Sequence, residues 1–68
     1  MENLTWLQRM DADIDRSFRI EAAVLALGAT ADEAECAQVN ACHGGHNAPQ
    51  SEDGAEWMAY VRTLAEVA

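Results

Sequence analysis

The sequence predicts an all-α protein, in which a long amphipathic N-terminal helix is followed by two shorter helices in a small helical bundle. Apolar residues recur every three or four positions over residues 3–27, which is helical spacing. Two later segments open with residues that favour helix starts, and no segment alternates apolar and polar residues as a strand would. We therefore expect helices over about 3–27, 31–43 and 52–67, within a single domain that spans residues 1–68.

The first helix has one apolar face, and Gly28 is placed to end it. At roughly 24 residues and about 1.5 Å per residue it would be about 36 Å long. That length exceeds what a bundle of this size needs to cover its own core, so we expect a homodimer. The residues of this face are Leu4, Leu7, Met10, Ile14, Phe18, Ala22 and Leu25, and Trp6 and Val24 widen it.

The second helix should begin after Thr30, because Thr30 and Glu33 have the spacing of a capping box. It should end near His43, where two glycines follow. Its alanines fall on one side and permit close approach of the first helix; they are Ala31, Ala34, Ala37 and Ala41. The opposite side carries a mixed set that we expect to face solvent or a partner, namely Asp32, Cys36, Val39 and His43.

Residues 44–50 contain the only proline and two of the four glycines, and are predicted to form a loop. Ser51 is expected to cap the third helix, with Glu52 and Asp53 in its first turn. This helix has an apolar face of its own, made of Trp57, Tyr60, Val61, Leu64 and Ala68.

The chain is strongly acidic, with twelve Asp and Glu against four arginines, and its formal net charge is −8. Such a charge disfavours direct binding to nucleic acids or to anionic membranes, and favours partners with a basic surface. No apolar run is long enough to cross a bilayer, and the N-terminus lacks the features of a signal peptide. We therefore expect a soluble, cytoplasmic protein.

All cysteines and histidines lie within residues 36–46, which makes this segment a candidate metal site. Cys36, Cys42, His43 and His46 match the ligand types and number of a tetrahedral zinc site. Their spacing does not match the common zinc motifs, and an unbroken helix could not gather all four. The alternative is that the thiols are small buried groups and the histidines are cap and loop residues.

The two cysteines are also poor candidates for disulfide formation or catalysis. On a continuous helix their Cα atoms would be roughly 9 Å apart, beyond the ~7 Å limit for a disulfide. A nucleophile activated by the adjacent histidine would need a preformed pocket, which a helical bundle of this size offers poorly. We therefore expect neither an internal disulfide nor an enzyme.

The sequence favours a small acidic regulator or inhibitor that occupies the surface of a partner protein, of the kind that phages and other mobile elements produce. Glu21 lies in the apolar face of the first helix, and Arg62 is its candidate counter-ion. Two alternatives remain: a module stapled by zinc at residues 36–46, and an acidic mimic of nucleic acid that blocks a DNA- or RNA-binding protein. The expected partner contacts are Trp6, Met10, Phe18, Glu21, Trp57 and Tyr60.

Overall fold

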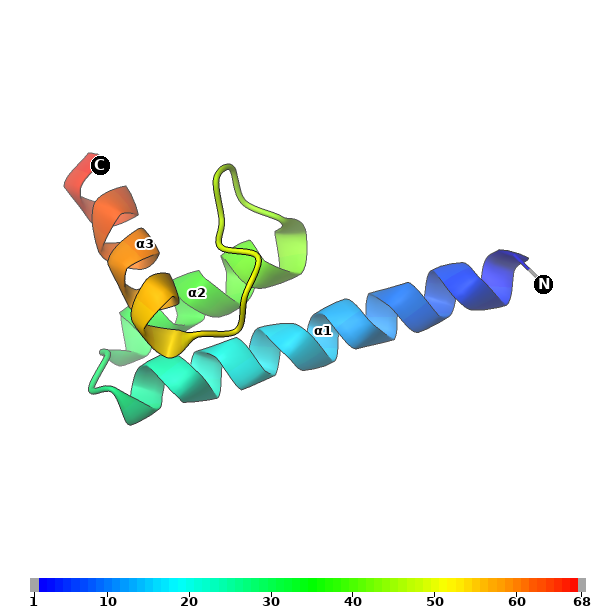
Figure 1. Cartoon of the computed structure of the whole chain (residues 1–68), viewed down its shortest axis with the longest axis horizontal. Coiled ribbons are helices and arrows are strands. Elements are labelled where there is room, and N and C mark those ends of the chain that lie inside the picture. The colour runs from blue at the N-terminus through cyan, green and yellow to red at the C-terminus, as the bar shows by residue number, and fades with distance from the viewer. Residues whose placement is uncertain (1, 68) are drawn as a thin grey trace.

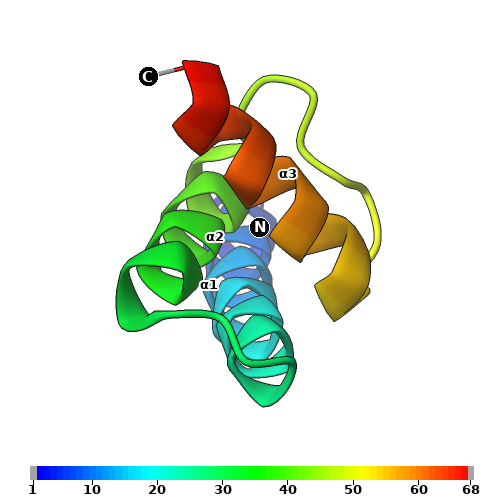
Figure 2. The ribbon, with the colours of Figure 1, turned by 90° about the vertical axis from the view of Figure 1, so that its left-hand side faces the viewer.

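The computed structural model contains three α-helices: α1 (Glu2–Ala26), α2 (Ala31–His43) and α3 (Gly54–Val67) (Figure 1). It describes the backbone of residues 2–67 and the side chains of residues 8–66. The all-α prediction is confirmed, and the three helices pack into a compact globule. Both α2 and α3 lie on one side of α1, and within residues 2–67 no other helix covers its remaining side (Figures 1 and 2).

A tight turn joins α1 to α2, and local sequence signals account for it. Gly28 adopts a φ of 96°, and the Ala29 N–H donates to the Val24 carbonyl at 3.1 Å. Thr30 then caps α2 through the expected box, in which Glu33 N–H donates to the threonine hydroxyl and Thr30 N–H donates to the glutamate. At the other end of α2, Gly44 is left-handed, with a φ of 66°.

The third helix begins at Gly54, two residues later than its predicted start. Its cap is Asp53 rather than Ser51, because the Asp53 carboxylate accepts the Ala55 N–H at 3.1 Å. The Ser51 hydroxyl instead accepts the Asp53 N–H and donates to Glu56. The loop from α2 therefore ends in a hydrogen-bonded turn that precedes α3.

The core lies where all three helices meet, and Trp57 is its largest member. The Trp57 side chain is 0% exposed, its indole N–H donates to the Ser51 carbonyl at 2.8 Å, and its ring meets Tyr60 edge to face. Trp57 therefore cannot serve as the exposed partner anchor that the sequence suggested. The buried apolar residues are Ile20, Val24, Ala34, Ala37, Ala41, Trp57 and Val61, so three of the four predicted alanines are buried.

The structure corrects the prediction of which side of α1 is buried. The buried side carries Ser17, Ile20 and Val24. Val24 was expected to widen the predicted face, whereas the other described members of that face are exposed, namely Met10, Ile14, Phe18, Ala22 and Leu25. The Ser17 hydroxyl is buried but satisfied, since it donates to the Ile14 carbonyl at 2.6 Å and accepts from Gln38 at 3.2 Å. Because α2 has 13 residues and α1 has 25, α2 can cover only part of α1.

Among the described residues, no helix is both long enough and apolar enough to cross a membrane.

Candidate functional site

Four of the six exposed large apolar side chains among the described residues lie along one side of α1, and we call this surface the α1 face. It consists of four side chains that retain large exposed fractions: Met10 (44%), Ile14 (37%), Phe18 (53%) and Leu25 (47%). Spacings of four, four and seven residues place them in one row along the helix. Exposed apolar rows of this kind mark interaction surfaces more often than isolated exposed side chains do.

Acidic residues border the α1 face. Asp11 and Asp15 are exposed and directly follow Met10 and Ile14. Glu21 is half-buried and lies one helical turn from both Phe18 and Leu25, because it is three residues from the first and four from the second. Glu21 therefore lies beside the α1 face, whereas the spacing of the apolar residues had placed it within that face.

The predicted counter-ion of Glu21 has a different partner. Arg62 Nε donates to Glu33 Oε2 at 3.1 Å, so α3 is paired with the start of α2. The pKa of Glu33 is lowered, first by the hydrogen bond from the Thr30 backbone N–H and then by Arg62. The capping box and the ion pair thus share one carboxylate, and Arg62 is not the counter-ion of Glu21.

A second ion pair joins α1 to the residues that precede α3. Arg19 donates to both carboxylate oxygens of Glu52, at 2.9 and 3.0 Å. This bidentate hydrogen bonding raises the pKa of Arg19 and lowers the pKa of Glu52. Both side chains remain about half exposed, so the pair orients the chain more than it stabilises the fold.

Arg16 fastens the loop between α2 and α3 to α1. Its Nη2 atom donates to the carbonyls of Gln50 and Ser51 at 3.0 and 3.1 Å, and lies 3.4 Å from the carbonyl of Pro49. The guanidinium carbon also lies 6.0 Å from the centre of the Trp57 ring, within the range of a cation–π contact. The end of this loop is therefore held over the core.

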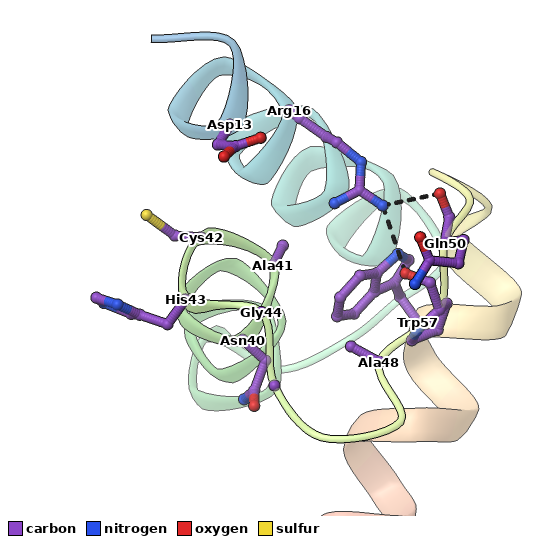
Figure 3. A pocket seen from close by; sticks show the side chains of 12 residues that line it. Asp13, Arg16, Asn40, Ala41, Cys42, His43, Gly44, Ala48, Gln50 and Trp57 are labelled. Atoms are coloured by element: carbon purple, nitrogen blue, oxygen red, sulfur yellow. Dashed lines mark hydrogen bonds between the residues drawn. The ribbon is translucent and has the colours of Figure 1, made fainter. Parts of the chain in front are cut away.

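A pocket of about 520 Å³ lies between α1, the end of α2 and this loop. Ala41, Ala48 and the Trp57 ring line it together with Arg16 (Figure 3). Cys42 and His43 also border the pocket, but their side chains point away from Trp57 and Arg16 (Figure 3). Cys42 and His43 therefore do not form a reactive pair directed into the pocket.

The structure does not assemble the predicted metal ligands. The helix α2 runs unbroken through Cys36 and Cys42 to His43, and both thiols are free. Within the described side chains, 8–66, no three His, Cys, Asp or Glu residues come together in a group that could hold a metal ion. The Cys36 sulfur instead accepts a long hydrogen bond from Asn40, and the His46 carbonyl accepts one from Tyr60.

The predicted partner contacts therefore divide into three groups. Met10, Phe18 and Glu21 lie on or beside the α1 face, whereas Trp57 is in the core and Tyr60 is half-buried with its hydroxyl bound to the loop. The side chain of Trp6 lies outside the described residues. The sequence contact set omitted Ile14 and Leu25, although their helical spacing from Phe18 could have identified both. No local pattern signals the role of Arg16.

Searches of protein-family models, of curated proteins and of solved structures find no match to this chain.

Proposed function

We propose that this chain is a small acidic regulator or inhibitor that inserts the α1 face into a groove on a partner protein and thereby occupies that surface. The observation that carries the proposal is the exposure of Met10, Ile14, Phe18 and Leu25 in one row. From Met10 to Leu25 the row extends for roughly 22 Å at 1.5 Å per residue. Amphipathic helices that bind grooves use anchors at this kind of spacing.

The anchoring of α1 supports the same proposal. Ile20 and Val24 are buried against the rest of the protein, and the buried Ser17 is hydrogen-bonded to α2. Much of the α1 face is therefore presented on a helix that is already ordered, which lowers the entropic cost of binding. Phe18 is the most exposed member and has the largest apolar area, so it is the expected central anchor.

A second candidate is self-association through the same face. It is favoured by the length of α1, which has 25 residues against 13 in α2 and projects beyond the other helices (Figure 1). Two copies of α1 packed face to face would cover their apolar rows mutually. The two candidates differ in the protein that a crosslink from this face would capture.

The test is site-specific photo-crosslinking in the source cells. A photoreactive phenylalanine analogue is placed at Phe18, and a matched variant carries it at Thr63, which is exposed on α3. We expect position 18 to crosslink one defined partner, identified by mass spectrometry, that position 63 does not capture. Identical crosslinks from both positions, or none from position 18, would refute the proposal. An adduct of twice the chain mass from position 18 alone would instead establish the dimer.

A further inference from the structure

We infer that the occupant of the α1 face is a groove edged by lysine or arginine on a different protein, and not a second copy of this chain. The inference rests on the proposed function and adds the chemistry of the partner to it. It follows from the distribution of charge around the α1 face.

The border of the α1 face is acidic. Asp11 and Asp15 are exposed, lie four residues apart and form one edge beside Ile14 and Phe18. Glu21 lies between Phe18 and Leu25 at the side toward the core. Each of these carboxylates is within one turn of an apolar member of the face, so a docked partner must meet negative charge at both edges.

The arginines of α1 do not neutralise this border. At about 3.6 residues per turn, Arg9 and Arg16 lie roughly opposite Phe18 on the helix. Arg16 is also engaged by loop carbonyls. Arg19 is one turn from Asp15, and the charge of Asp15 contributes to its raised pKa, but its guanidinium is held by both oxygens of Glu52.

The neighbouring helix adds no lysine or arginine to this border. The sequence of α2, which packs against α1, contains no lysine or arginine, whereas Asp32 and Glu35 are exposed on it. The whole chain has four arginines and no lysine, and Arg62 is paired with Glu33. The acidic border of the α1 face thus has no lysine or arginine of α2 to neutralise it, and the one arginine of α3 is already paired.

This distribution separates the two possible occupants. In a symmetric dimer each protomer offers the same patch, so the acidic border of one copy would face the acidic border of the other. Like charges brought together at an interface oppose binding and reject that partner. A groove edged by lysine or arginine would instead complement the border, and the net charge of −8 would accelerate its approach.

The experiment uses the intact chain and two synthetic amphipathic helical peptides. The peptides share one leucine face and differ only in carrying lysine or glutamate along its edges. We expect the chain to bind the lysine peptide at least about tenfold more tightly than the glutamate peptide at about 50 mM NaCl. The difference in affinity between the two peptides should become smaller at about 500 mM NaCl, because salt screens exposed charges. Sedimentation equilibrium of the chain alone at about 100 µM should show monomers.

Two matched variants test the effect of the border charges separately from docking of the apolar residues. D11N/D15N removes two charges from the border, and D32N/E66Q removes two exposed charges elsewhere. We expect only the first to reduce the preference for the lysine peptide, by about threefold or more. Four outcomes would overturn the inference: equal affinity for both peptides, an equal effect of the two variants on the preference for the lysine peptide, no binding of either peptide, or a stable wild-type dimer. Unchanged peptide binding by Phe18→Ala would refute the docking role itself.

Discussion

Replacement of Gly54 by alanine tests how closely the start of α3 approaches the end of α1. Gly54 is buried, and a Cβ atom there would lie 2.9 Å from the Ala23 carbonyl oxygen, 3.0 Å from its carbon and 3.1 Å from Leu27 Cδ1. Two of these neighbours are backbone atoms of α1, so relief of the contact requires α3 to shift. Such overpacking costs about 1–3 kcal/mol.

Helix propensity alone predicts that Gly54→Ala would stabilise the protein. Alanine is favoured over glycine by about 0.8–1 kcal/mol within a helix, and by less at a first position. The steric cost should prevail, so we expect Gly54→Ala to lower the free energy of unfolding by about 1–2 kcal/mol. For a domain of this size each kcal/mol corresponds to a fall in Tm of about 4–8 °C.

Urea unfolding followed by circular dichroism provides the measurement. Ala59→Gly is the matched control, because Ala59 is exposed in the same helix and should reveal propensity without a packing effect. We expect this control to lose about 0.5–1 kcal/mol. A Gly54→Ala protein as stable as the wild type, or more stable, would show that the two helices do not approach as closely as described.

Three further outcomes are expected. Trp57→Phe should lower the free energy of unfolding by about 1–3 kcal/mol in urea titrations, because it removes a fully buried indole whose N–H donates at 2.8 Å; an unchanged midpoint would exclude Trp57 from the core. Glu33 has a lowered pKa through Thr30 and Arg62, so its ionised form stabilises the fold above the usual value of 4.5 and this contribution is lost as pH falls through the lowered pKa. The stability difference between wild type and Glu33→Gln should therefore shrink from neutral pH toward about pH 3, and a constant difference would contradict the hydrogen bonding. Phe18→Gln should change the unfolding free energy by less than about 0.5 kcal/mol, whereas a large loss would show that Phe18 belongs to the core.

The helices and their ends could be predicted because their signals are local. The Thr30 hydroxyl and the Glu33 carboxylate satisfy backbone donors within the same turn, and Gly44 provides the left-handed residue that ends α2. The start of α3 was less certain from sequence, since Ser51 and Asp53 are both suitable caps. At this point Gly54 approaches α1 closely and the Ser51 carbonyl accepts from Arg16, and both contacts involve residues far away in the sequence.

The buried side of α1 could not be predicted from periodicity alone. The helix has two adjacent apolar rows, one with Ile20 and Val24 and the other with Ile14 and Phe18, and both have helical spacing. The first is buried because the alanines of α2 and the indole of Trp57 pack there. Spacing therefore identified the candidate surface but did not distinguish the row that packs on α2 and α3 from the row that stays exposed; only the tertiary packing does so.

The hydrogen bonds of Arg16 hold only the end of the segment between α2 and α3, so its two halves should differ in how well they tolerate inserted residues. Extra residues beside Asn47, which is exposed, would enlarge a bend while leaving the carbonyls of Gln50 and Ser51 in reach of the guanidinium. Extra residues after Gln50 would instead separate the Gln50 and Ser51 carbonyls, which both accept from Nη2 of Arg16. A tag or an inserted peptide is therefore best accommodated beside Asn47.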